Sequence, residues 1–203
     1  MKLYYSKGAC SLAVRIVIHE LGLPSEYESV NLKTKVTESG ANFLEINPKG
    51  AVPTLVTDNK TVMTENAVIQ QYLAETNKNH TLLPPVGDPK RYKVLEWLNF
   101  ISTDIHNGFG AFFNPAISDE LKASLFLPML KRKFAIANQA LANQNFLMGD
   151  TFTLPDSYLF VMILWTFGMK IDIQEFPNLI RYFEALKKRP SVAASLAEEG
   201  LAN

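Results

Sequence analysis

Residues 2–22, with the sequence KLYYSKGACSLAVRIVIHELG, hold the pattern that decides how this 203-residue chain folds. Residues 2–5 predict a strand. Residues 11–21 carry apolar side chains at helical spacing, Leu12 and Ile16 among them, and Gly22 follows as a C-terminal glycine. The chain therefore opens with a strand that leads directly into a helix, and the Gly-Ala-Cys-Ser segment at residues 8–11 joins the two.

The next residues continue the alternation of strand and helix. Five further elements are predicted, in this order: strand 27–32, helix 38–46, strands 54–57 and 61–63, and helix 65–75. A turn signal, Asn47-Pro48-Lys49-Gly50, follows the short helix. The last two strands flank Asp58-Asn59-Lys60 and are expected to form a hairpin. The order β-α-β-α-β-β-α predicts an α/β domain with a mixed four-stranded sheet and helices packed on it.

The second half of the chain has a different character. Residues 78–90 are rich in proline, glycine and polar side chains and are the best candidate for a linker. After them, all predicted elements are helices: 90–112, 118–144, 153–169, 177–188 and 191–199. Pro128 should kink or split the second of these. We therefore predict a domain over residues 1–80, a linker over 81–89 and an all-α helical domain over 90–203.

Composition narrows the function classes. The chain is 47% hydrophobic and 20% charged, which is typical of a soluble globular protein. Twenty basic residues balance twenty acidic ones, so no overall attraction for nucleic acid or an anionic membrane is expected. No secretory signal is visible, and the longest apolar run, 158–165, is too short to span a bilayer. A single cysteine excludes intrachain disulfides and multi-cysteine metal sites. These observations predict a cytoplasmic protein with no metal.

Cys10 is the first candidate for chemistry. It stands at the start of the helix predicted over 11–21. The positive end of a helix dipole favours thiolate over thiol, and helix N-termini can lower a thiol pKa from about 8.5 into the physiological range. The competing interpretation is a small buried residue, because free cysteine is among the most buried residue types. The position alone leaves both interpretations open.

His106 is the second candidate. On the helix predicted over 90–112, Asn99, Thr103, His106 and Asn107 lie nearly opposite the apolar side. Such a stripe is usually a solvated face. This one lacks the long charged side chains that solvent-facing stripes favour, and it contains an imidazole. The wall of a polar pocket is the competing interpretation.

Two further motifs have both structural and binding interpretations, and a third has a structural one. Pro53 holds Val52 extended, and a cis bond would turn the Val52 backbone outward for pairing with an extended peptide, although X-Pro bonds are mostly trans. Asn66 could cap the helix that follows, whose first N–H groups could bind a carboxylate. Glu65 could accept a ligand ammonium or simply complement the helix dipole. Residues 153–156, Thr-Leu-Pro-Asp, predict a capping box with a structural role.

Together these motifs resemble the beta-class (bacterial) glutathione S-transferases. The resemblance extends over nearly the whole chain and is densest at 1–5, 8–12, 47–53, 64–65, 71–74, 96–100 and 153–156. The joint order and spacing are specific, and Cys10 with His106 indicates the beta class over the classes that use tyrosine or serine. Three positions depart from the usual pattern: Lys7 in place of proline, Asn66 in place of serine or glycine, and Asp104 in place of glutamate.

The resemblance implies a thioredoxin-like N-terminal domain, an all-helical C-terminal domain and a homodimer. Cys10 and His106 would be catalytic, with Cys10 beside the sulfur of glutathione and His106 approaching it from the other domain. The other implied glutathione-binding residues are Val52 and Pro53 at the cysteinyl part, Glu65 and Asn66 at the γ-glutamyl end, Lys35 at the glycine carboxylate, and Asn99, Thr103 and Asp104 on the helix lining the cleft. Asp104 would act across the dimer.

The expected reaction is attack by the glutathione thiolate on a small hydrophobic electrophile, with Phe109, Phe112 and Phe113 lining the electrophile pocket and detoxification as the role. Glutathione would be a co-substrate, with no permanently bound cofactor. Two alternatives remain. Cys10 could form a mixed disulfide that serves thiol-disulfide exchange or peroxide reduction. The fold could also serve ligand or partner binding without catalysis.

Overall fold

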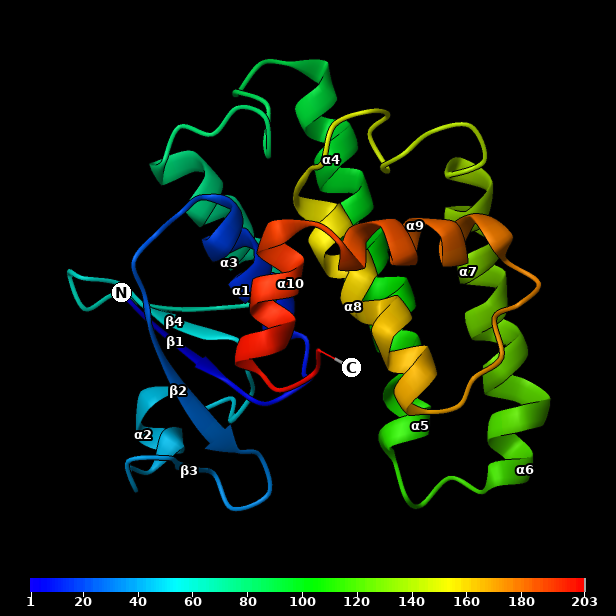
Figure 1. Cartoon of the computed structure of the whole chain (residues 1–203). Coiled ribbons are helices and arrows are strands. Elements are labelled where there is room, and N and C mark those ends of the chain that lie inside the picture. The colour runs from blue at the N-terminus through cyan, green and yellow to red at the C-terminus, as the bar shows by residue number, and fades with distance from the viewer. Residues whose placement is uncertain (203) are drawn as a thin grey trace. The chain divides into compact units, whose positions relative to one another are not determined.

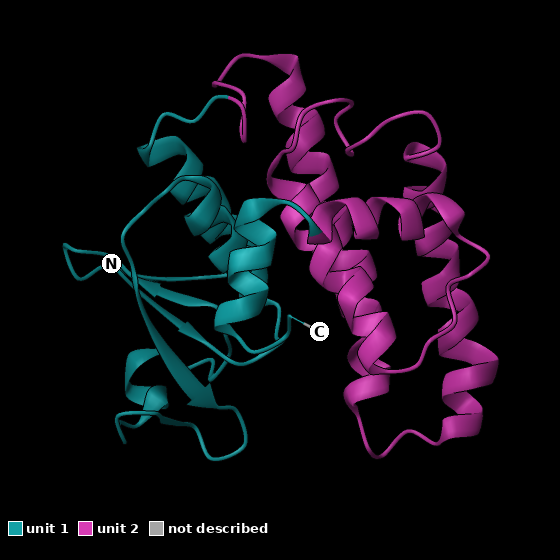
Figure 2. Cartoon of the chain, viewed as in Figure 1, with its two compact units in different colours: residues 1–80, 188–203 teal, residues 81–187 magenta. Residues whose placement is uncertain are grey.

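The computed structural model describes residues 1–202, and they form two compact units. The first unit contains residues 1–80 and the end of the chain from Lys188, and the second contains Thr81–Lys187 (Figure 2). The sequence-based division placed everything after residue 90 in one helical domain. The structure differs at the C-terminus, because the last helix packs on the first helix of the chain and so belongs to the first unit.

The first unit is built on a five-stranded mixed sheet (Figure 1). The strands are β1 (Lys2–Tyr5), β2 (Glu26–Asn31), β3 (Val36–Thr37), β4 (Thr54–Val56) and β5 (Val62–Thr64), in the spatial order β3-β2-β1-β4-β5. β1 and β2 are parallel, and the other pairs are antiparallel. Leu3, at the centre of β1, is level with Tyr27 on one side and Leu55 on the other.

The predicted four-stranded sheet lacked β3, the fifth strand of the structure. β3 has only two residues, too few to show the alternation by which a strand is recognised in sequence. It also occupies part of the chain next to the helix predicted over 38–46, which in the structure is the single turn α2 (Phe43–Ile46). Between β3 and α2, the Thr37 and Ala41 backbones are hydrogen-bonded, so this segment turns back before the helix begins.

Three longer helices complete the first unit: α1 (Ser11–Glu20), α3 (Asn66–Thr76) and α10 (Pro190–Glu198). Eight consecutive residues of α1, from Ser11 to Ile18, are buried. Arg15 lies among them, over the rings of Tyr5 and Tyr27, and its guanidinium pairs with Glu198 at 2.8 Å and Glu199 at 3.1 Å. A buried cation must be paired, and these two carboxylates at the end of α10 provide the pairing that fixes α10 on α1.

The second unit contains only helices and loops. Its helices are α4 (Pro89–Phe100), the π-helical turn η1 (Ile101–His106), α5 (Gly110–Phe113), α6 (Asp119–Leu121), the π-helical turn η2 (Lys122–Phe126), α7 (Leu127–Ala140), α8 (Leu154–Gly168) and α9 (Pro177–Lys187). Pro128 was expected to interrupt a helix over 118–144. It is the second residue of α7, directly after η2, so the interruption takes the form of a π-helical turn on the N-terminal side of Pro128.

α8 is the buried axis of this unit. Its first ten residues, Leu154–Ile163, are all buried. The predicted capping box is confirmed: Thr153 and Asp156 hydrogen bond to each other's backbone N–H groups at the start of α8. The Asp156 carboxylate also accepts hydrogen bonds from the Leu147 N–H and the Tyr182 hydroxyl, both at 2.9 Å. Within residues 1–202, no helix has the length and apolar character needed to cross a membrane.

Candidate functional site

Cys10 lies where the loop after β1 enters α1. The Ala9 N–H donates to the Ser6 carbonyl, and Gly8 takes a left-handed conformation (φ 68°), so the chain turns sharply before Cys10. The Cys10 side chain is 8% exposed, and its thiol donates a hydrogen bond to the Val52 carbonyl at 3.3 Å. Cys10 is therefore both buried and at a helix start.

The thiol of Cys10 is held in its protonated form. Burial raises the pKa of Cys10 to about 11, although the Asn66 amide and the backbone N–H groups of Cys10 and Ser11 act in the opposite direction. The helix-dipole argument predicted the reverse shift. Desolvation prevails because little of the side chain reaches water, and a charged sulfur there would lose its hydration. In this state Cys10 is a hydrogen-bond donor rather than a nucleophile.

The loop before β4 presents the carbonyl that Cys10 contacts. The Val52–Pro53 peptide bond is cis, and both residues are buried. Upstream, the Asn47 amide donates to the Ala51 carbonyl at 2.8 Å and to the Thr54 hydroxyl at 2.9 Å, which fixes the turn on both sides of the proline. The Lys35 ammonium donates to the Gly50 carbonyl at 2.7 Å. Lys35 is thereby attached to the same loop as Val52.

Asn66 joins the starts of two helices. Its side-chain amide donates to the Cys10 carbonyl at 2.6 Å, and its oxygen accepts from the Gln70 amide at 2.6 Å. The expected capping role is wrong: the N-cap is Glu65, in a positive-φ conformation (φ 70°), and Asn66 is the first helical residue. Its amide is buried and turned towards α1, because Cys10 offers a carbonyl there. Asn66 thus connects the head of α3 to the head of α1.

Glu65 is exposed and already has a cation beside it. Its carboxylate pairs with the Lys49 ammonium at 2.6 Å, and Lys49 also donates to the Thr64 hydroxyl at 3.0 Å. Sequence reasoning used Lys49 only as part of a turn signal and missed this pairing. The first unit therefore links six of the predicted residues through direct contacts or chain neighbours: Cys10, Lys35, Val52, Pro53, Glu65 and Asn66.

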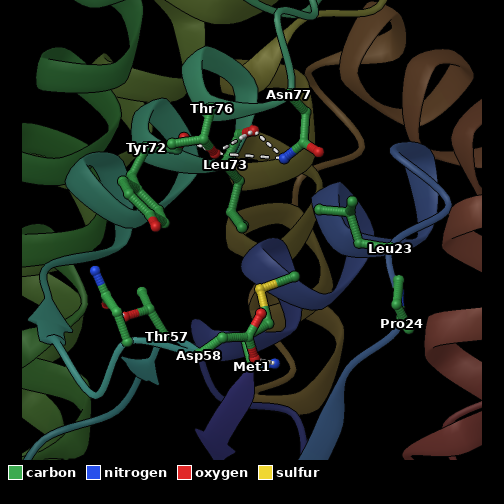
Figure 3. A pocket seen from close by; sticks show the side chains of 10 residues that line it. Met1, Leu23, Pro24, Thr57, Asp58, Tyr72, Leu73, Thr76 and Asn77 are labelled. Atoms are coloured by element: carbon green, nitrogen blue, oxygen red, sulfur yellow. Dashed lines mark hydrogen bonds and ion pairs between the residues drawn. The ribbon is translucent and has the colours of Figure 1, made fainter.

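A separate hollow of about 340 Å³ lies elsewhere in the first unit (Figure 3). It is lined by the chain start, the loop before β2, the β4–β5 turn and the end of α3, with Met1, Pro24, Asp58 and Tyr72 among its residues. Met1 precedes β1, whereas Cys10 follows the end of that strand, so the two places lie at opposite ends of β1. None of the predicted site residues lines this hollow, and we assign it no chemistry.

In the second unit, His106 is the last residue of the π-helical turn η1. Its Nδ1 is hydrogen-bonded to the Tyr158 hydroxyl at 2.5 Å, and its ring forms a T-shaped contact with Trp165 at a centroid distance of 5.0 Å. Burial lowers the pKa of His106, so its imidazole is neutral at neutral pH. The ring borders an open hollow of about 410 Å³, lined by Ser102, Thr103, His106, Asn107, Gly110 and Phe113.

The other predicted residues of this unit divide between the hollow and its surroundings. Asn99 and Thr103 are exposed, and the Thr103 hydroxyl donates to the Asn99 carbonyl at 3.0 Å. Asp104 forms an ion pair with Lys133, and this hydrogen bond holds the pKa of Asp104 below its usual value. Sequence reasoning did not find Lys133, Tyr158 or Trp165.

The three phenylalanines occupy different environments. Phe113 is 57% exposed and lines the hollow beside His106. Phe109 is fully buried and packs against Phe134 and Trp165, so it is a core residue beneath this surface. Phe112 is half-buried and contacts Phe109. Of the predicted pocket-lining aromatic residues, the structure places Phe113 directly at the hollow.

A mixed sheet with a cysteine at its first helix, a cis-proline loop facing that cysteine, and a separate helical unit together define a thioredoxin-like transferase architecture. Residues 8–76 match the family described as glutathione S-transferase, N-terminal domain, and residues 101–190 match its C-terminal domain. The chain belongs to the glutathione S-transferase family and is a transferase, as its sequence motifs predicted.

Individual relatives support this assignment and the predicted beta class. Glutathione S-transferase GstA of Escherichia coli O157:H7 is 38% identical over 201 residues, which cover 99% of this chain and 100% of that protein. The bacterial beta-class enzyme of Sphingomonas chungbukensis is 37% identical, with a TM-score of 0.94 and coverage of 99% and 100%. A sphingomonad glutathione S-transferase complexed with glutathione is 39% identical, with a TM-score of 0.93 and full coverage of both chains.

Proposed function

We propose that this enzyme transfers the thiolate of glutathione to small hydrophobic electrophiles. One observation carries the proposal: the buried Cys10 thiol donates to the carbonyl that precedes the cis-proline, and the Asn66 amide holds the Cys10 backbone where the heads of two helices meet. Backbone N–H groups at helix starts stabilise bound anions, including a sulfur anion. A thiol donor placed among them is suited to holding a second sulfur in its ionised form.

The charges around Cys10 fit the ends of the tripeptide. We infer that the glycine carboxylate binds the Lys35 ammonium, which is held next to the Val52 loop through Gly50. The γ-glutamyl end would lie at the head of α3, with its ammonium on Glu65 and its carboxylate on the first N–H groups of the helix. The backbone of Val52 would pair with the cysteinyl part in an extended conformation.

The protonation states favour conjugation over disulfide exchange. Exchange requires a thiolate at Cys10, and burial keeps that thiol protonated near neutral pH. A neutral thiol instead donates a hydrogen bond to the thiolate of glutathione, lowers its pKa and enlarges the nucleophilic fraction. We propose that His106, also uncharged, supplies a second donor to the same sulfur and that the electrophile occupies the hollow beside Phe113.

We also propose that the enzyme is a cytoplasmic homodimer with a role in detoxification. Apolar side chains left exposed on the first unit support association: Val62 on β5 and Val68 on α3 are 46% and 52% exposed. Asp104 is paired with Lys133 within its own chain, so a contact of Asp104 with glutathione across the dimer would have to compete with that ion pair. Sedimentation analysis of Val68→Lys against the unmodified protein tests the dimer.

Two measurements test the catalytic proposal. The protein should be retained on glutathione-agarose and should conjugate members of an electrophile panel. His106→Ala should raise the apparent pKa of bound glutathione and slow turnover, because one donor to the sulfur is lost. Loss of retention would return the chain to the binding-protein alternative. A glutathione adduct on Cys10 after treatment with oxidised glutathione, together with faster disulfide reduction than conjugation, would support the exchange alternative instead.

A further inference from the structure

The hydroxyl of Tyr158 and the imidazole of His106 form a partly buried pair that the family assignment does not explain. Tyr158 is 1% exposed and lies in the second turn of α8. Its hydroxyl oxygen is 2.5 Å from Nδ1 of His106. Trp165, two turns further along α8, meets the same ring edge-on. Two side chains of one helix therefore hold the imidazole, one through a hydrogen bond and one through ring packing.

We propose that Tyr158 is a positioning residue, which donates its hydroxyl proton to Nδ1 of His106 and thereby fixes the neutral imidazole with its proton on Nε2. This proposal rests on the proposed function, in which His106 donates to the sulfur of glutathione. Among the described residues the His106 imidazole has no other hydrogen-bond partner, so Nδ1 is occupied and Nε2 is the nitrogen left for a bound molecule. The ring borders the hollow in which that molecule would lie.

The tautomer decides whether the imidazole attracts or repels a thiolate. Burial lowers the pKa of His106, so the ring carries one proton at neutral pH rather than two. A neutral imidazole donates from one nitrogen and accepts at the other. If Nδ1 held the proton, Nε2 would present a lone pair to the sulfur anion. With Nδ1 accepting from Tyr158, Nε2–H presents a donor, and the hydroxyl therefore sets the sign of the interaction.

The surrounding structure makes Tyr158 a better anchor than the helix that carries His106. His106 ends a π-helical turn, a widened turn that is often found at functional sites. Tyr158 stands two residues after Asp156, whose carboxylate fixes the start of α8 with several buried hydrogen bonds. The phenol is therefore held by the core, and the hydrogen bond transmits this fixed position to the imidazole.

Nitrogen-15 NMR of the ligand-free protein tests the positioning directly. The tautomer of each histidine is read from its ring nitrogen shifts, and His106→Gln assigns the His106 signals among the three histidines. We expect the Nε2–H tautomer in the unmodified protein and a mixture of tautomers in Tyr158→Phe, which keeps the ring and loses only the hydroxyl. The matched control is Tyr182→Phe, another fully buried tyrosine of the same unit, whose hydroxyl binds Asp156. A native Nδ1–H tautomer, or an unchanged tautomer in Tyr158→Phe, would overturn the proposal.

Kinetics test whether the fixed tautomer is used in catalysis. Losing one oriented hydrogen bond should lower kcat/KM of Tyr158→Phe by about three- to tenfold, with kcat affected more than KM for glutathione. In Tyr158→Phe, the rise of kcat/KM with pH should also shift to higher pH than in the unmodified protein, because the thiol of bound glutathione ionises less readily. In a His106→Gln background, where the amide replaces Nε2–H, Tyr158→Phe should add nothing.

The NMR and kinetic experiments distinguish failure of this proposal from failure of the proposed function on which it rests. If no electrophile is turned over, the proposed function fails, while the NMR result still decides whether Tyr158 sets the tautomer. If the tautomer shifts in Tyr158→Phe but kcat/KM and the pH profile match those of Tyr182→Phe, the positioning role in catalysis is refuted. A drop in rate that persists in the His106→Gln background also refutes it, because the hydroxyl would then act on something other than His106.

Discussion

The reactivity of Cys10 towards an alkylating reagent should be strongly suppressed at neutral pH. Cys10 is the single cysteine of the chain, so one added carbamidomethyl group in intact-mass spectrometry reports on this side chain alone. The thiolate is the form that reacts with iodoacetamide. Because burial raises the pKa of Cys10 to about 11, the thiolate is scarce until the solution is strongly alkaline.

The size of the suppression follows from the pKa. Cys10 titrates at about 11 instead of the ordinary 9.0. At pH 8, about one ordinary thiol in ten is ionised, against about one Cys10 thiol in a thousand, since each pKa unit is a factor of ten. We therefore expect Cys10 to react about 100-fold more slowly than the same residue in the chain unfolded by guanidinium chloride. The rate should rise about tenfold per pH unit up to pH 11.

The same protonation produces a stability change with a defined sign. The folded pKa of Cys10 is raised above its unfolded value, so this contribution is fully present below pH 9 and is lost as the pH rises towards 11. The free energy of unfolding should fall by up to about 1.4 kcal/mol per pH unit in that window, and Cys10→Ala should lack this component. A reaction rate with an inflection below pH 9, or equal rates in the folded and unfolded chain at pH 8, would refute the argument that Cys10 is a protonated donor.

Three further substitutions test other parts of the structure by urea unfolding. Asn66→Ala removes two buried hydrogen bonds, including the one that Gln70 donates, and should lower the free energy of unfolding by about 2–4 kcal/mol; a loss below 1 kcal/mol would mean that the connection between the helix heads is incidental. Asp156→Ala should lower the free energy of unfolding by about 3–5 kcal/mol because it leaves buried donors without an acceptor. These donors are the Leu147 and Thr153 N–H groups and the Thr153 and Tyr182 hydroxyls. Glu199→Ala should cost more than Glu199→Gln, since glutamine keeps an acceptor for the Gly8 N–H; equal losses would show that this contact does not matter.

The regular elements could be predicted because their signals are local. The helix over 11–21 and the strand over 2–5 were placed within one residue, since apolar spacing and a terminal glycine act within a single element. β3 could not be found, because two residues show no period. The docking of α10 on α1 was missed for a different reason: it depends on the buried charge of Arg15 finding its partners at the opposite end of the chain.

The candidate site shows the same division between local and tertiary causes. Position at a helix start made Cys10 a candidate, but the direction of its pKa shift depends on burial by the fold, which outweighs the opposing effect of the Asn66 amide. A local rule predicted that Asn66 caps its own helix, whereas in the structure its amide donates to the Cys10 carbonyl at the head of another helix. In both cases the state of the side chain differs from the local prediction, because the electrostatic environment of a side chain depends on the residues that the fold packs against it.

The contact between Tyr158 and His106 could have been predicted in part from the sequence. Tyr158 lies in the apolar run 158–165, which was interpreted as part of the helix over 153–169 and as too short to span a membrane. A phenol hydroxyl buried in such a run needs a hydrogen-bond partner, because an unpaired one costs free energy. That requirement predicts a polar side chain on a neighbouring element, and His106 was already the unusual residue on a polar stripe. Pairing a buried tyrosine with an unexplained imidazole would therefore have been a legitimate inference from the sequence, although which nitrogen it contacts required the structure.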